Sequence, residues 1–408
     1  MIGALRSGSW LTRERLRVYP LLLGLGLGAT LLGMIVTRIG VFDHWGRPLG
    51  SDFSQIWVAG GEIWAGHPAQ PYDNVAHAAA QAAAFGAPDS FYSWPYPPYF
   101  LAIAALAAML PYLAALAAWQ GATLVLYLGA VLRTGRGLWI ERGTLIGVAL
   151  VFPAVTVNLI HGHNGFLTTA LLAGGAMLLP TRPLLAGVLL GLLAYKPQLA
   201  LAVPVVLIAG GYWRSTVMAT GIVILSTVAT VAAFGIGPWQ AFVASMAFTR
   251  HVVLEQGGPG FAKMQSPFAA VRLLGGGIPL AYVFQGIVTV AVLVALAIVW
   301  KSHADLRLKV ASLLVASLLT TPYCLDYDMV MLGPALAGLA SFGLEDGFRP
   351  YGKTLLAAAW IVPLLARPVA IATALPGGAL LMIILFWHVF LWARAPTSER
   401  PRAPQMSP

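Results

Sequence analysis

The stretch GSDFSQIW, from Gly50 to Trp57, places an aspartate at the start of a helical pattern. An aspartate at the N-cap of a helix accepts a backbone N–H and is favoured by the helix dipole. A carboxylate held near a hydroxyl can instead take its proton as a general base. Only 9% of the chain is charged. Asp52 therefore has three open roles: a helix cap, a loop charge or a reacting group.

Lys196 is a charged residue inside the apolar run 183–211, within the tetrapeptide YKPQ. The proline removes a backbone donor and kinks or ends a helix, so two short membrane helices should meet there. A cation near hydrocarbon is costly, and such residues are usually functional or reach out to the headgroups. Lys196 is therefore either a snorkelling side chain or an anion ligand. As an anion ligand it would be assisted by Gln198 as a hydrogen-bond donor.

Polar residues also gather at two turns between apolar runs. His161, His163 and Asn164 lie at the first turn, where two histidines at i and i+2 could contact a metal, but a third ligand is not evident. Turn polarity and hydrogen bonding to a phosphate or sugar are the alternatives. At the second turn Asp326 and Asp328 match a D-x-D metal pattern. Sugar binding and an ion pair with an arginine also remain open, and we rank metal last.

Membrane helices must position these residues. The chain has 408 residues, 59% of them apolar, and a mean hydropathy of +0.80. A soluble domain carries roughly 25% charged residues. The sequence predicts an all-α polytopic membrane protein, with residues 1–408 as one domain. A single cysteine, Cys324, excludes an internal disulfide and a Cys-based zinc site. The net charge of +10 has no soluble basic domain to carry it, so we expect no nucleic-acid partner.

About ten to twelve membrane helices are expected from runs near the roughly 20 residues that cross a bilayer. The first run follows four arginines and lacks a cleavage site, which is typical of a retained signal anchor. The run 97–132 is longer than one span needs, so it should include a tilted or interfacial piece. The spans lie near 18–39, 97–132, 144–160, 164–181, 183–211, 215–236, 279–300, 309–322, 327–343, 353–373 and 376–394.

Alternation of the spans places most Lys and Arg residues on the side of the two termini. Cytoplasmic segments carry this excess, so both termini, including the tail 395–408, are expected in the cytoplasm. The long segments 40–96 and 237–278 are then outer loops. In the second loop, the glycine-rich GGPGFAK at 257–263 indicates mobility. Arg250 and His251 in the same loop are either solvated charges or ligands of an anion.

The first outer loop should contain two short helices. One begins at Asp52, and its aromatic face indicates a helix lying along the outer membrane surface. That face consists of Phe53, Trp57, Gly60 and Trp64. The other, over 75–85, is rich in alanine, follows Asp73 and Asn74, and stops at Gly86.

Six motifs occur in order along the chain. They are D-F-x-x-x-W from Asp52, G-x-P-x-x-x-Y from Gly66, W-P-Y-P-P from Trp94, G-H-N-G from Gly162, G-x-x-x-G-L-x-x-x-K-P-Q from Gly187, and T-P-Y-x-x-D-Y-D from Thr321. In this order the chain resembles the GT-C glycosyltransferases of the polyprenol-phosphate-mannose-dependent α-1,2-mannosyltransferase type. The resemblance covers roughly residues 45–330. It implies a GT-C fold in a bacterial inner or plasma membrane, with the active site on the outer face.

The resemblance also implies an inverting transfer from a polyprenyl-phosphate sugar, most simply mannose, to an acceptor hydroxyl of a glycolipid or polysaccharide. Asp52 would be the general base. No acid is needed for the leaving group, because phosphate leaves readily, and no cofactor is expected. The chain departs from the family pattern at His163, where glutamine is usual, and at Trp94, where tyrosine is usual. Both changes could alter the choice of sugar. The residues expected to bind the donor are Tyr96, His161, His163, Asn164, Lys196, Gln198, Arg250, His251, Asp326 and Asp328.

Two other functions remain open from the sequence. A flippase or transporter of lipid-linked sugar would explain the membrane helices and Lys196 equally well, but it needs no acid before a surface helix. The absence of a detectable internal repeat also weakens it. The same type of enzyme using arabinose, glucose or an aminosugar is the second. Membrane lipid surrounds the protein in every case.

Overall fold

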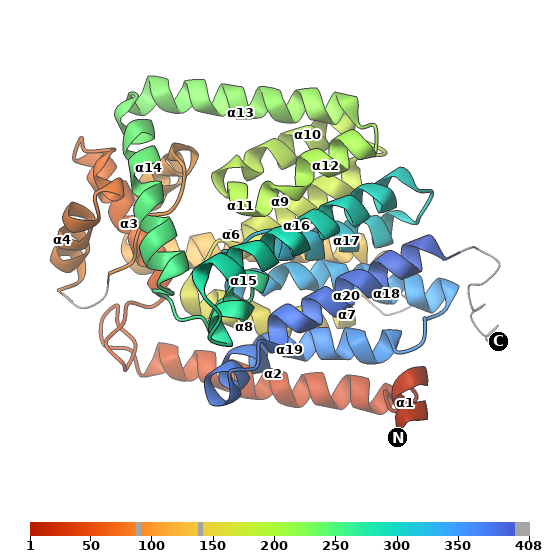
Figure 1. Ribbon diagram of the computed structural model, residues 1–408. Helices are drawn as coiled ribbons and strands as arrows, with labels where there is room; N and C mark the ends of the chain where they lie inside the picture. The colour runs from red at the N-terminus through yellow and green to blue at the C-terminus, as the bar shows by residue number, and fades with distance from the viewer. Residues whose placement is uncertain (87–90, 138–141, 396–408) are drawn as a thin grey trace.

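The chain folds into a bundle of helices in the computed structural model, which describes residues 1–86, 91–137 and 142–395 (Figure 1). No strand occurs in these ranges. Within them seven helices are long and apolar enough to cross a membrane. They are α2 (Arg13–Val36), α6 (Tyr112–Thr134), α13 (Trp213–Phe234), α16 (Ile278–Lys301), η5 with α18 (Asp326–Asp346), α19 (Gly352–Thr373) and α20 (Gly377–Arg394). The predicted all-α polytopic fold is confirmed.

Shorter helices fill the space between the long ones. α7 (Arg142–Leu150) and α8 (Pro153–His161) form a pair bent by 56°. The other short apolar segments are η2 with α5 (Pro98–Ala107), α9 (Gly165–Leu178), α10 with η3 (Pro183–Tyr195), and α11 with α12 (Pro197–Ala209). The expected ten to twelve membrane helices are reached only when these segments are counted with the long ones. α17 (Leu306–Leu319) lies in the core, where every residue from Val310 to Leu319 is buried.

Prolines set most of the breaks. The predicted break at YKPQ is confirmed, since η3 ends at Tyr195 and α11 begins at Pro197. The long run 97–132 also divides as expected, because α5 ends at Ala107 and α6 begins after Pro111. The span expected over 144–160 is present only as the bent pair of α7 and α8, which together are long and apolar enough to cross a membrane. Pro153 is the first residue of α8, and a proline there fits a helix start but interrupts the helix before it.

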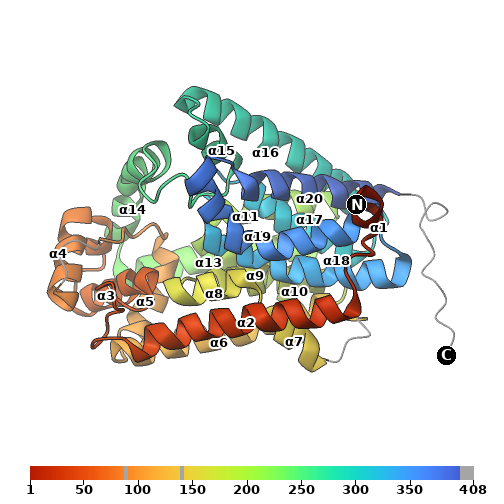
Figure 2. The same cartoon turned by 90° about the horizontal axis from the view of Figure 1, so that it is seen from below.

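The described parts of the segments 40–96 and 237–278 lie at one end of the bundle, away from α1 (Ile2–Ser7) and the end of α20 (Figures 1 and 2). The second segment is largely helical rather than one long loop, and its glycine-rich stretch 257–263 lies outside the helices. It forms α14 (Gly237–Phe248), the π-helix η4 (Thr249–Glu255) and α15 (Pro267–Leu273). Its glycines and prolines mark the boundaries of these helices, a use that the sequence pattern does not distinguish from a loop.

The two helices predicted in 40–96 are present as α3 (Ser51–Trp64) and α4 (Asn74–Phe85). The aromatic face of α3 packs on α5: a Cβ at Gly60 would collide with the backbone of Ala104, and the indole N–H of Trp64 donates to the Ala105 carbonyl at 2.9 Å. The carboxylate of Asp73 caps the start of α4, and Gly86 is the C-cap of the helix. These contacts fix the position of α3, and with it the position of Asp52.

Candidate functional site

Asp52 is the second residue of α3, and it does not cap the helix. The N-cap is Gly50, with φ +67°, and no side chain accepts a capping hydrogen bond there. Asp52 is only 8% exposed. In the part of the chain that the structure describes, its carboxylate has no hydrogen-bond or ion-pair partner. A nearly buried carboxylate without a partner is costly, which makes Asp52 a candidate for a reacting group.

Two glycines dock the start of α3 onto the turn that follows α8. A Cβ at Gly162 would lie 2.8 Å from the Cβ of Phe53 and 2.9 Å from the Cα of Gly50. Gly162 also has φ +64°, which favours glycine. The hydroxyl of Tyr112 donates to the Leu49 carbonyl at 2.5 Å and holds the chain just before the helix. Asp52 is thus fixed beside the turn that carries His161, His163 and Asn164.

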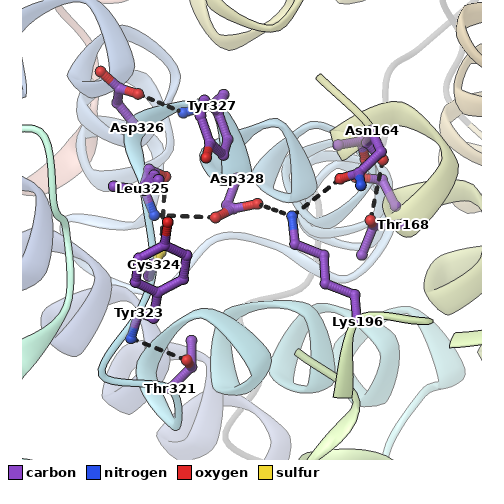
Figure 3. A network of polar contacts seen from close by, with 12 residues as sticks. Asn164, Thr168, Lys196, Thr321, Tyr323, Cys324, Leu325, Asp326, Tyr327 and Asp328 are labelled. Atoms are coloured by element: carbon purple, nitrogen blue, oxygen red, sulfur yellow. Dashed lines mark hydrogen bonds and ion pairs between the residues drawn. The ribbon is translucent and has the colours of Figure 1, made fainter. Parts of the chain in front are cut away.

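Lys196 lies at the break between η3 and α11 and is held inside the protein (Figure 3). Its ammonium donates to Asp328 Oδ1 at 2.7 Å and to Asn164 Oδ1 at 3.2 Å. The other carboxylate oxygen of Asp328 accepts from the backbone N–H of Leu325 at 3.0 Å. Lys196 and Asp328 are 3% and 2% exposed. The lysine therefore does not snorkel to the surface, and two of the predicted polar residues, Asn164 and Asp328, meet at its ammonium.

Asp326 faces a different cation. It lies 3.6 Å from the guanidinium of Arg367 and accepts the backbone N–H of Tyr327 at 2.9 Å. The ion pair with an arginine that the sequence left open is therefore present. Because the two acids of the D-x-D pattern turn to Arg367 and to Lys196, they do not converge on one point.

We call the turn with His161, His163 and Asn164 the histidine turn. It contains one ring nitrogen that accepts a hydrogen bond and two buried atoms that have no partner. Nδ1 of His161 lies 2.9 Å from the Val157 carbonyl, which only accepts, so this nitrogen carries the hydrogen. Nε2 is then free to accept from the ammonium of Lys263 at 3.0 Å. His163 stacks on Tyr327 at 3.6 Å between centroids. Burial and, after it, the charge of Lys196 hold the pKa of His163 well below its ordinary value. The atoms without a partner are His163 Nδ1 and Asn164 Nδ2.

Lys263 is a site residue that the sequence reasoning missed. The segment that contains it pairs with the D-x-D segment: Gln265 N–H donates to the Cys324 carbonyl at 2.7 Å, and Asp326 N–H donates to the Lys263 carbonyl at 3.1 Å. Cys324 is fully buried. The ammonium of Lys263 donates to Nε2 of His161, lies 5.2 Å from the centroid of the Tyr327 ring, and acts through its charge on the carboxylate of Asp326. The sequence feature that could have identified Lys263 is its position at the end of GGPGFAK, a stretch that we interpreted as part of a mobile loop.

The charges of Asp52 and Asp328 both act on the hydroxyls of two tyrosines, Tyr96 and Tyr323. Burial raises the pKa of Tyr96 well above its ordinary value, and the charges of Asp52 and Asp328 raise it further. Burial, then Asp52, then Asp328 raise the pKa of Tyr323 in the same way. Both hydroxyls therefore stay protonated and can donate, and neither has a hydrogen-bond partner among the described residues. Both hydroxyls are therefore within electrostatic reach of Asp52 and of Asp328.

Three predicted residues do not join this group. Gln198 is half-buried on α11 and makes no hydrogen bond to another described residue. Arg250 and His251 are exposed on η4, where they lie 3.7 and 3.3 Å from Glu255. Both are surface charges that lie against an acid of their own helix.

The described residues thus bring together a carboxylate without a partner, two lysines, two tyrosine hydroxyls and a buried turn with free hydrogen-bonding atoms. A family model described as "Glycosyltransferase family 87" matches residues 94–322. This stretch contains Tyr96, the histidine turn, Lys196 and Lys263; Asp52 lies before it and Asp328 after it. None of the curated proteins and none of the solved structures compared with the chain matches it.

Proposed function

Because the chain belongs to glycosyltransferase family 87, a membership that makes it a glycosyltransferase, we propose that it transfers a sugar from a polyprenyl-phosphate donor to an acceptor hydroxyl on the outer face of the membrane. Mannose is the first sugar to test, and a glycolipid or polysaccharide is the acceptor. The observation that supports this most is the carboxylate of Asp52, nearly buried, without a partner and fixed against the histidine turn. Family membership also favours a transferase over the flippase considered from the sequence.

The proposed reaction is a single inverting displacement. The acceptor oxygen attacks the anomeric carbon, and its proton passes to the carboxylate of Asp52. The bond between the anomeric carbon and the phosphate oxygen breaks on the opposite side. Its electron pair stays on the phosphate, so the products are the glycosylated acceptor and the polyprenyl phosphate. One base suffices, because the leaving phosphate needs no proton.

The two lysines have different parts in this scheme. Lys196 shares its charge with Asp328, so it contributes little net charge to an incoming anion. Lys263 forms no ion pair with a described acid, although its charge acts on the carboxylate of Asp326, so more of its charge than that of Lys196 is available for the phosphate. The free atoms of His163 and Asn164, together with the hydroxyls of Tyr96 and Tyr323, would then orient the phosphate and the sugar.

Asp52→Asn tests the base. The amide cannot take a proton, so transfer should fall by roughly 10²-fold or more, whereas donor affinity and thermal stability should stay near those of the wild type because Asp52 makes no capping bond. The assay is transfer by purified protein in lipid, with a panel of labelled polyprenyl-phosphate sugars. The panel also tests the choice of sugar.

Asp73→Asn is the matched control. Asp73 belongs to the same segment and caps α4 through the backbone N–H groups of Val75 and Ala76. Asparagine caps a helix about as well as aspartate, so this variant should keep its activity. Near-normal transfer by the Asp52→Asn variant would remove Asp52 as the base and leave the family membership intact.

A further inference from the structure

Four arginines lie near the end of the bundle that carries the N-terminus. Arg133 is in the last turn of α6, and Arg136 follows that helix. Arg182 is the N-cap of α10, and Arg214 is in the first turn of α13. α13 starts at the end opposite to α14, as Figure 1 shows. This end therefore lies on the other side of the bundle from the site around Asp52.

The arginines are close to one another, and no acid described in the structure pairs with them. Arg136 and Arg182 lie close enough to Arg133 for their charges to repel it. The hydroxyl of Ser215 donates to the Pro183 carbonyl at 2.8 Å and ties the starts of α13 and α10 together, so Arg182 and Arg214 are held side by side. The side chains of all four make no hydrogen bond or ion pair to another described residue. Neighbouring like charges without a counterion favour the binding of an anion.

Two of these arginines border an open cavity of about 490 Å³, which we call the arginine cavity. It is lined by Arg182, Pro183, Leu184, Leu185 and Arg214. The two leucines are exposed, and so is Trp213 at the start of α13. The cavity therefore joins a cationic rim to an apolar wall. Tryptophan beside it is typical of the depth at which lipid headgroups lie.

We propose that the arginine cavity binds the headgroup of an anionic phospholipid. The phosphate would lie between Arg182 and Arg214, which can each donate two parallel N–H bonds to phosphate oxygens. The start of the acyl chains would lie against Leu184 and Leu185. A free phosphate ion would use the guanidinium groups but would leave the apolar wall exposed, so the charge and the wall together fit a lipid. The proposal is independent of the sugar-transfer reaction.

Native mass spectrometry of the full-length protein in detergent tests this binding. Phosphatidylglycerol should remain bound, whereas phosphatidylcholine with the same acyl chains should be lost. In the double variant Arg182→Gln with Arg214→Gln, the affinity for phosphatidylglycerol should fall by roughly tenfold or more, from the attraction of each arginine to an anionic headgroup. Because both side chains are exposed, the melting temperature of the lipid-free protein should not change.

Arg250→Gln is the control, since Arg250 is an exposed arginine at the opposite end of the bundle, and it should leave lipid binding unchanged. Three results would each overturn the proposal: retention of phosphatidylglycerol by the double variant, equal binding of the two lipids, or full displacement of the lipid by millimolar inorganic phosphate. The last would assign the cavity to a free anion.

Discussion

Lys196 and Lys263 lie 5.8 and 5.2 Å from the centroid of one ring, that of Tyr327, but they have unequal partners. Lys196→Ala leaves the carboxylate of Asp328 buried without a counterion, which costs about 3–5 kcal/mol of stability in buried pairs. Lys263→Ala removes a charge that forms no ion pair with a described acid and acts on the carboxylate of Asp326 only from a distance. We therefore expect Lys196→Ala to lower the melting temperature strongly, and Lys263→Ala to weaken donor affinity while the melting temperature stays near the wild-type value.

Thermal unfolding in detergent and a donor-binding titration measure the two effects. In a double variant with Asp328→Asn, the stability lost by Lys196→Ala should partly return, because no buried charge is then left alone. Wild-type donor affinity in the Lys263→Ala variant would take Lys263 out of the phosphate site. A melting temperature unchanged by Lys196→Ala would show that Asp328 finds another partner.

The sequence selected Asp52, Lys196, His163 and Asn164 because each is a polar residue next to apolar runs. The pair formed by Lys196 and Asp328 could not be read from the sequence, since 132 positions separate them and the chain pattern carries no distance between helices. Whether Asp52 caps the helix could not be read from the sequence either. The answer depends on Gly50, which has a positive φ and is itself the N-cap.

At the level of elements, the contact between α3 and the turn after α8 positions the base. Gly162→Ala would press a methyl group against Phe53 and Gly50 and push α3 away from the turn. A displacement on the order of 1 Å can lower a rate by about 10²-fold. We expect transfer to fall by a factor of that order, well beyond what the loss of stability alone would explain, as measured by transfer rate and melting temperature.

Gly40→Ala is the matched control for this variant. Gly40 has φ +63°, almost the value at Gly162, but a Cβ there would meet nothing within 4 Å. Both variants carry the backbone strain of a positive φ, and only Gly162→Ala adds the collision. If both variants lost the same activity, strain alone would account for the loss, and the docking of α3 would have no part in it.

Sequence patterns gave the helix breaks at YKPQ and before α6, where proline interrupts an apolar run. They missed the bend where Pro153 begins α8, and they missed the short helices α14 and α15, which glycines and prolines separate. The physical reason is that one local signal serves both a loop and a helix boundary. Which of the two forms depends on packing against the rest of the bundle.

On the scale of the whole molecule, the placement of the two long segments at one end leads to a topology prediction. Reporter fusions near 75 and 255 should be extracytoplasmic, and a fusion near 305, after α16, should be cytoplasmic. The physical reason is the excess of Lys and Arg with the termini. The first two positions must agree with each other because their segments share one end (Figure 1).

The measurement is the activity of a compartment-specific reporter fused at each position. A cytoplasmic signal at 75 and 255 together would move the site around Asp52 to the cytoplasmic face, and the proposed acceptor would then be wrong. A split result, with 75 and 255 on opposite sides, would contradict the arrangement of the helices itself.

Cys324 is the one thiol in the sequence, and it is fully buried beside the segment of Lys263. Burial raises the pKa of the thiol well above its ordinary value, so little of the reactive thiolate exists at neutral pH. Alkylating reagents should therefore label the native protein slowly and the unfolded chain at once. The wild-type chain thus contains its own chemical reporter of unfolding, placed at the site and usable in intact membranes without an engineered label.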